Sequence, residues 1–132
     1  MSRPHDATDS PLDVLGADNA PAFSLAFLRA SPDGVKLLNR EGRVTFVSDT
    51  GLALMGLSDR RDVVGRQWWE LWPEAAEPEL RAAFGRAASG EIARLSADRD
   101  LAGTSRTWQV TLSPIVNADG AVESILAVTR PV

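Results

Sequence analysis

Turn-forming residues divide this chain into short strands, a group of helices, and further strands. Clusters of Pro, Asp, Asn and Gly lie at residues 31–34 and 117–120, and Gly42 lies in the polar stretch of residues 40–43; these residue types favour tight turns. Two strand-like segments come first, helices follow, and three strand-like segments end the chain. Because consecutive antiparallel strands are joined by short hairpins, this order predicts an α+β domain with an antiparallel sheet.

Five segments carry apolar residues in strand-like patterns. In residues 106–113, Trp108, Val110 and Leu112 fall on one face, as in a half-buried strand. Residues 122–129 are apolar on both faces, which predicts a strand near the centre of the sheet. The five segments are residues 35–39, 44–47, 91–97, 106–113 and 122–129.

Two features set the expected ends of the later strands. Residues 98–105 are mostly polar and predict a loop. Pro114 has no backbone N–H and is expected to bend or end the strand before it. The strand between them is therefore expected over residues 106–113.

The clearest helix is expected at residues 77–89. Pro78 suits the first turn of a helix, and Gly90 suits the residue after its end. Leu80 and Phe84 belong to one apolar stripe, which is expected to face the core. Three further helical segments are expected. The first is residues 20–30, the second is a short segment that follows the capping residues 48–50, and the third is residues 67–72.

The composition fits one folded domain and argues against several kinds of site. The chain has 132 residues, 44% hydrophobic and 24% charged, as in an ordinary globular domain. It has no Cys and one His, His5, which argues against disulfides, histidine metal clusters and Ser-His-Asp triads. The net charge of −4 argues against a nucleic-acid partner. No apolar run approaches the roughly 20 residues that span a bilayer, so we expect no membrane partner and a cytoplasmic location.

No arrangement of residues indicates catalysis. Glu74, Glu77 and Glu79 cluster at the start of the helix at residues 77–89, where negative charge complements the helix dipole. The glycines form no phosphate-binding pattern. We therefore expect that the chain is not an enzyme. A small α+β enzyme is an alternative, which the missing Cys and the lone His disfavour.

Taken in order, the turn and strand motifs of residues 31–130 resemble those of PAS domains. The motifs are Ser31-Pro32-Asp33-Gly34-Val35, Gly42-Arg43-Val44, Val47-Ser48, Gly65-Arg66, Ser113-Pro114-Ile115 and Asp119-Gly120. Their order and spacing carry the match. The stretch from Trp108 to Pro114, with the pair Trp68-Trp69, resembles the PAS sensors of bacterial two-component histidine kinases in particular.

The resemblance implies a five-stranded antiparallel sheet in the order 2-1-5-4-3, with the middle helices on one face. PAS domains bind haem, flavins, other chromophores or small metabolites between helices and sheet, or bind nothing there. The absence of Cys excludes a flavin–cysteinyl adduct and a thioester-linked chromophore. Residues 77–89 lack the His that haem-binding members use, so a His-ligated haem is not expected, whereas non-covalent FAD stays open.

The expected pocket is rich in tryptophan. Trp108 either stacks on a ligand or fills the core, and its size favours the core. Trp68 and Trp72 lie four residues apart and share a face, whereas Trp69 points elsewhere; a structural role is favoured for them too. The pocket candidates are Lys36, Leu38, Phe46, Met55, Trp68, Trp72, Leu80, Phe84, Trp108, Val110, Leu112, Ala127 and Thr129.

Lys36 stands inside an apolar strand. Alternation places it on the same face as Leu38. A lysine that points into the pocket favours an anionic ligand such as a carboxylate. The alternative, which general burial tendencies favour, is a solvent-facing lysine with Val35 and Leu37 in the core.

These features together favour a sensory or interaction PAS module of a bacterial signal-transduction protein, which responds to a small ligand or redox cofactor, mediates dimerisation, or does both. The alternative is a ligand-free protein–protein adaptor with a filled core. We expect a disordered or partly helical tail at residues 1–17, a flanking helix at residues 18–30 and the PAS domain at residues 31–130. The family usually places an output helix after this point, so we expect a fused output domain or a downstream signalling partner.

The final strand also indicates how two copies associate. Ile125 and Ala127 face one way and Leu126 and Val128 the other, but the middle helices cover only one face. The second face would expose an apolar patch, which soluble monomers avoid. We expect the helix at residues 20–30 to cover it, within one chain or across a homodimer. The interface candidates are Phe23, Ala26, Phe27, Leu126 and Val128.

Overall fold

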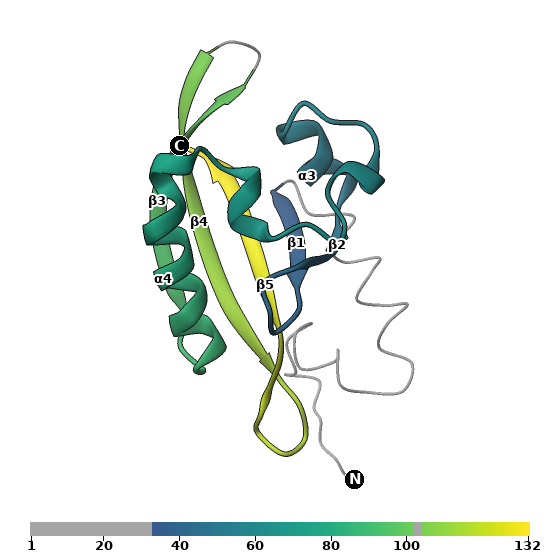
Figure 1. Ribbon diagram of the computed structural model, residues 1–132, viewed down its shortest axis with the longest axis vertical. Coiled ribbons are helices and arrows are strands. Elements are labelled where there is room, and N and C mark those ends of the chain that lie inside the picture. Colours follow the sequence, from purple (N-terminus) through teal and green to yellow (C-terminus); the bar gives the residue numbers. More distant parts are fainter. Residues whose placement is uncertain (1–32, 102–103) are drawn as a thin grey trace, which may run out of the picture.

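The computed structural model describes residues 33–101 and 104–132, which form a curved antiparallel sheet with helices on one side (Figure 1). The strands are β1 (Gly34–Leu38), β2 (Val44–Val47), β3 (Ala93–Leu101), β4 (Thr104–Val116) and β5 (Val122–Pro131). Their order in the sheet is β2-β1-β5-β4-β3. This order confirms the predicted fold, and the central place of β5 agrees with its two apolar faces.

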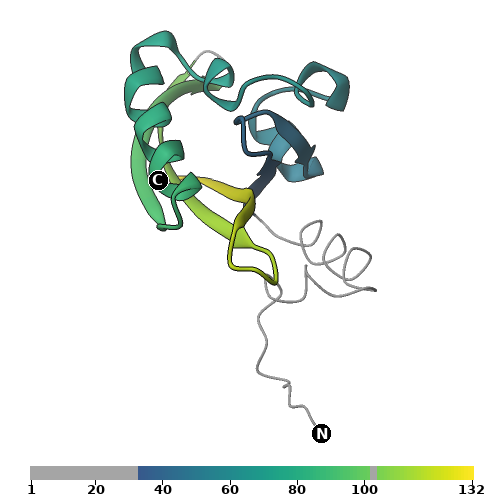
Figure 2. The same ribbon diagram turned by 60° about the horizontal axis from the view of Figure 1, so that its bottom comes forward.

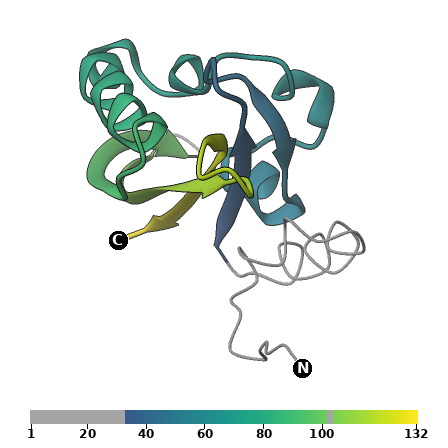
Figure 3. The same ribbon diagram turned by 90° about the horizontal axis from the view of Figure 1, so that it is seen from below.

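Helices fill the chain between β2 and β3. They are α3 (Asp49–Leu54), the 3₁₀ turns η1 (Arg60–Asp62), η2 (Trp68–Leu71) and η3 (Glu74–Ala76), and α4 (Glu77–Ala88). This connection arches from the β1–β2 end of the sheet to α4 (Figure 2), and α4 lies against one side of the sheet (Figure 3). None of the described helices is both long and apolar enough to cross a membrane. The helix expected at residues 20–30 and the tail before it lie outside the described residues.

Two local features explain how β1, β2 and α3 are joined. In the β1–β2 loop, Gly42 has φ +87°, a conformation that glycine adopts without steric cost. At the start of α3, the Ser48 hydroxyl accepts hydrogen bonds from Gly51 N–H (3.0 Å) and Val35 N–H (3.1 Å). Ser48 therefore caps α3 as predicted and also ties the helix to β1.

The loop predicted at residues 98–105 is wrong, because β3 and β4 continue through most of it. Asp98 pairs with Thr107 and Arg99 with Arg106 across the hairpin. The Thr107 hydroxyl also donates a 2.8 Å hydrogen bond to the Asp98 carboxylate. Backbone pairing thus extends the hairpin regardless of the polar side chains.

Of the two outcomes expected at Pro114, a bend or an end of the strand, the end is wrong, because β4 runs on to Val116. β3 begins opposite Leu112, so beyond that residue β4 pairs only with β5, where Pro114 stands opposite Ile125. One side of the strand is free at this point, which is where a sheet tolerates proline.

Buried residues form two clusters on the two faces of the sheet. The larger lies between the sheet and the helices and includes Ile125 and Ala127 of β5. The smaller, on the opposite face, contains Leu126 with Val128 packed against it. The predicted division of β5 between two faces is therefore confirmed.

Candidate ligand-binding site

The η2 turn is held over the sheet by hydrogen bonds to the β1–β2 hairpin. Gly65 N–H donates to the Val44 carbonyl at 2.7 Å, and Val44 N–H donates to the Arg66 carbonyl at 2.9 Å. Trp68 N–H donates to the Gly42 carbonyl at 2.8 Å. The chain before η2 therefore runs beside β2, which fixes where the tryptophans of η2 point.

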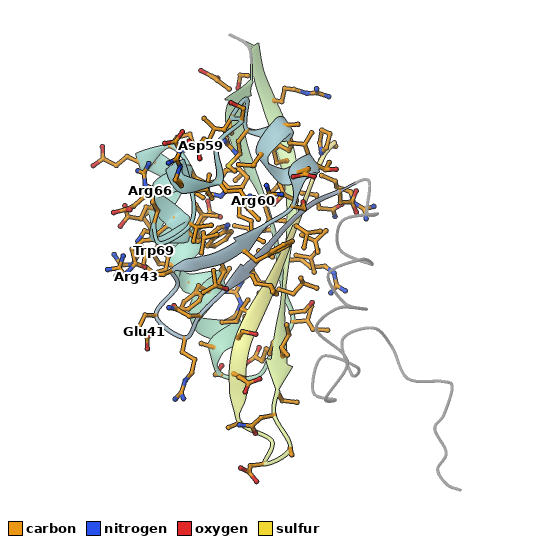
Figure 4. The ribbon with its side chains drawn as sticks, turned by 90° about the vertical axis from the view of Figure 1, so that its right-hand side faces the viewer. Glu41, Arg43, Asp59, Arg60, Arg66 and Trp69 are labelled. Carbon is orange, nitrogen blue, oxygen red and sulfur yellow. The ribbon has the colours of Figure 1, made fainter. Side chains whose placement is uncertain are left out.

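Trp68 and Trp72 point into the interior, where their side chains are 0% and 5% exposed. Their rings meet edge to face, with centroids 6.4 Å apart. Trp69 points outward, and Figure 4 shows it on the same side of the molecule as Arg43. Its ring packs on Phe84 at 5.6 Å between centroids, and the Arg81 guanidinium lies 4.7 Å from its centroid. The predicted division of the three side chains is confirmed.

Trp108 is 1% exposed, so it lies inside the domain as predicted. Its indole N–H donates a 3.2 Å hydrogen bond to the main-chain carbonyl of Arg99. Across the β3–β4 hairpin it stands opposite Ala97, whose small side chain leaves room for the indole. Both its burial and its satisfied N–H are typical of a residue that fills a core.

Most of the predicted pocket residues come together on the inner face. Met55 and Phe84 are partly buried against the larger cluster. The buried members of that cluster include Leu38, Trp68, Trp72, Leu80, Trp108, Val110, Leu112 and Ala127. Their role in ligand binding stays a prediction.

Phe46 is the exception, because it packs with Leu37 on the outer face. An irregularity in the β1–β2 pairing between Leu37 and Leu38 breaks the alternation of the strands. Val44, opposite Leu38, therefore faces inward, and Phe46, opposite Leu37, faces outward. The placement of Phe46 in the pocket is wrong.

Lys36 is 3% exposed and stands on the inner face with Leu38, opposite Ala127. The solvent-facing alternative is therefore wrong. Burial, and to a lesser extent the positive charge of Arg99, together lower the pKa of the Lys36 ammonium to about 8. At neutral pH the ammonium is still mostly protonated, so a positive charge lies inside the domain.

Four other buried polar side-chain atoms of the described residues lack a partner. The indole N–H groups of Trp68 and Trp72, the hydroxyl of Thr129 and the amide oxygen of Gln67 make no hydrogen bond. Thr129 stands opposite Gly34, two residues along β5 from the partner of Lys36, so Lys36 and Thr129 are diagonal neighbours. A lysine, two indoles and a hydroxyl all donate hydrogen bonds. Apart from the Gln67 amide oxygen, the unpaired buried groups are therefore donors.

A groove of about 860 Å³ runs beside this cluster, at the free edge of β3. Arg99 lines the groove, and its guanidinium lies 5.5 Å from the ring centroid of Trp72. Burial lowers the pKa of Arg99. Sequence reasoning missed Arg99 because it assigned this residue to a loop. The extended β3–β4 pairing brings its side chain over Trp72, the residue that follows η2.

The remaining candidates are placed as follows. Leu126 is buried on the outer face and Val128 is half-buried beside it, while Phe23, Ala26 and Phe27 lie outside the described residues. No cluster of His, Cys, Asp or Glu in the described part of the chain is arranged to hold a metal ion.

Several solved structures share this fold. The PAS domain of BvgS from Bordetella pertussis is 19% identical, with a TM-score of 0.71 over 87% of this chain and 88% of that chain. The PAS domain of an HTR-like protein from Haloarcula marismortui is 19% identical, with a TM-score of 0.65 over 85% and 91% of the two chains. VqmA bound to DPO is 13% identical, with a TM-score of 0.70 over 84% and 57%.

The sequence comparisons are consistent with this likeness. No curated protein matches the sequence. The family model described as PAS fold matches residues 28–132, which is most of the chain and includes all five strands. The chain therefore belongs to the PAS family.

Proposed function

We propose that this chain is a sensory module of a bacterial signalling protein and that it responds to a small ligand held between the helices and the sheet. The unpartnered donors of Trp68, Trp72 and Thr129 carry this proposal. A buried polar group without a partner costs about 1–3 kcal/mol. A ligand that accepts hydrogen bonds from these groups would recover part of that cost.

The contacts of η2 suggest how the module responds. The Trp68 main-chain N–H is hydrogen-bonded to the Gly42 carbonyl in the β1–β2 loop, and the Trp69 ring packs on Phe84 of α4. A ligand that moves the indoles of η2 would therefore act on the hairpin and on α4 together. A homodimer, a downstream partner or fused output domain, and a cytoplasmic location belong to the same proposal.

The likeness to VqmA supports a ligand-binding role, because that protein was solved with DPO bound. The rival proposal is a ligand-free adaptor. It is favoured by the filled state of the core, in which Trp68 and Trp108 are both fully buried.

Native mass spectrometry of the freshly purified full chain distinguishes the two. We expect a bound mass that is retained under gentle ionisation and lost on denaturation, with near-ultraviolet and visible absorbance showing whether it is a chromophore. If the gentle and denatured masses agree, and no compound of a metabolite library raises the melting temperature, the adaptor is correct.

A further inference from the structure

Lys36 has no counter-charge in the part of the chain that the structure describes. Among residues 33–101 and 104–132, the buried polar or charged residues are Lys36, Ser48 and Thr129, so no carboxylate of these residues is buried with the ammonium. No hydrogen bond or ion pair between described residues involves the Lys36 side chain. A buried unpaired charge is among the costliest features that a folded protein can hold, and such a feature points to a missing partner.

A second cation lies close to the same cluster. Arg99 is half-buried, stacks over Trp72, and is near enough for its charge to act on Lys36. Its own side chain forms no ion pair with a described carboxylate. Glu79, Asp98 and Asp100 also line the groove, but all three are exposed, and Asp98 is hydrogen-bonded to Thr107. Arg99 is the half-buried charge of the groove lining, and it lies on the side of the groove next to Trp72.

We infer that the ligand of this module is a small molecule with one carboxylate, which binds against Lys36 and accepts hydrogen bonds from Thr129 and the indole N–H groups of Trp68 and Trp72. This inference rests on the proposed function and names its ligand class. The groove at the β3 edge, with Arg99 at its inner side, is the path of entry. The rest of the ligand is apolar, because the surrounding side chains are apolar.

The donor set favours a carboxylate over other ligands. A neutral ligand would leave the Lys36 charge uncompensated at neutral pH. A phosphate dianion carries more charge than the single Lys36 ammonium balances. One carboxylate has the lone pairs to accept from the ammonium, the hydroxyl and an indole N–H.

Isothermal titration calorimetry at neutral pH on the full chain tests the ligand class. The probes are hexanoate, benzoate and phenylacetate, each paired with its amide, which keeps the shape and removes the charge. Lys36→Met removes the ammonium while keeping an unbranched apolar chain. Arg94→Met is the matched control, because Arg94 is an exposed cation on β3 that lines a separate hollow on the outer side.

At least one carboxylate is expected to bind, with its amide at least about ten-fold weaker. Lys36→Met should weaken that carboxylate at least about ten-fold, and Arg94→Met should leave it unchanged. Equal affinity for acid and amide, an unaffected Lys36→Met variant, or no binding by any of the three carboxylates would overturn the inference. If a neutral molecule co-purifies in any of these cases, the sensory function stands and only the ligand class is wrong.

Discussion

Trp68 and Trp72 pack edge to face inside the domain, at an interplanar angle of 72°, and both bury an indole N–H that has no acceptor. Trp108, on the facing sheet, is just as buried but has an acceptor in the Arg99 carbonyl. The interior thus holds two kinds of tryptophan. Trp108 fills the core with its indole N–H already hydrogen-bonded. The indole N–H groups of Trp68 and Trp72 can still donate to an acceptor that a ligand brings.

Replacing Trp68 or Trp108 by phenylalanine should separate these two roles. Both changes shrink a fully buried ring, but only Trp108→Phe breaks a hydrogen bond. We expect Trp108→Phe to lower the free energy of unfolding by about 1–3 kcal/mol more than Trp68→Phe. Urea unfolding of both variants measures the difference. Equal losses would mean that the Trp68 N–H is satisfied in solution.

The stability of the protein should rise with pH in the alkaline range because of Lys36. The folded-state pKa is about 8, against 10.5 for an ordinary lysine, so between these values the unfolded chain holds a proton that the folded chain has released. The free energy of unfolding therefore rises from pH 8 towards pH 10.5. Below pH 8 the lysine is protonated in both states, so the folded protein bears the full cost of the buried charge.

Lys36→Met should remove this rise and stabilise the protein at neutral pH by about 3 kcal/mol. Urea unfolding from neutral pH to pH 10 on wild type, Lys36→Met and the control Arg94→Met measures both effects. If the free energy of unfolding changes with pH in the same way for wild type and Lys36→Met, the Lys36 ammonium is solvated in the folded protein.

The sequence predicted the fold well where side chains determine structure. The apolar stripe around Leu80 and the terminal Pro78 and Gly90 located α4, and the two apolar faces of the last strand located β5. Alternation also placed Lys36 on the correct face. The sequence could not show whether that face of β1 is exposed to solvent, because its burial depends on η2 and α4.

The failures concern features without a side-chain signature. The β3–β4 hairpin extends through Asp98 and Arg99 by backbone pairing, and Phe46 was turned outward by a pairing irregularity. The unpartnered indoles could not be foreseen either, because a missing acceptor is a property of the assembled interior. The candidate site was therefore predicted in outline, while its donors and Arg99 required the structure.

Gly42 and Gly85 should respond to alanine in opposite ways. A Cβ atom at Gly42 would lie 2.6 Å from the Trp69 ring, and φ there is +87°. We expect Gly42→Ala to cost about 2 kcal/mol or more. Gly85, inside α4, has no atom within 4 Å of such a Cβ, so Gly85→Ala should add about 0.5–1 kcal/mol of stability. The melting temperatures of the two variants test this prediction. A Gly42→Ala variant as stable as the wild type would show that Trp69 is free to move away.

Ser48→Ala should destabilise the junction of β1 and α3. The hydroxyl is fully buried and accepts from two backbone N–H groups, those of Val35 and Gly51. Losing both bonds should cost about 2–3 kcal/mol. Ser89→Ala, which removes an exposed hydroxyl bonded to Arg86, should change stability by less than about 0.5 kcal/mol. Similar losses at Ser48 and Ser89 in urea unfolding would contradict this role of Ser48.

The indole region of a ¹H–¹⁵N correlation spectrum tests the ligand site most directly. The chain has four tryptophans, so it gives four indole resonances, which single Trp→Phe variants assign. On titration with the tightest-binding of the three carboxylates, the resonance of Trp68, of Trp72 or of both should move downfield as the N–H gains an acceptor. Those of Trp69, which points outward, and Trp108, which already has an acceptor, should move little. If the Trp68 and Trp72 resonances stay fixed at saturation, the ligand does not bind at these donors and the account is wrong.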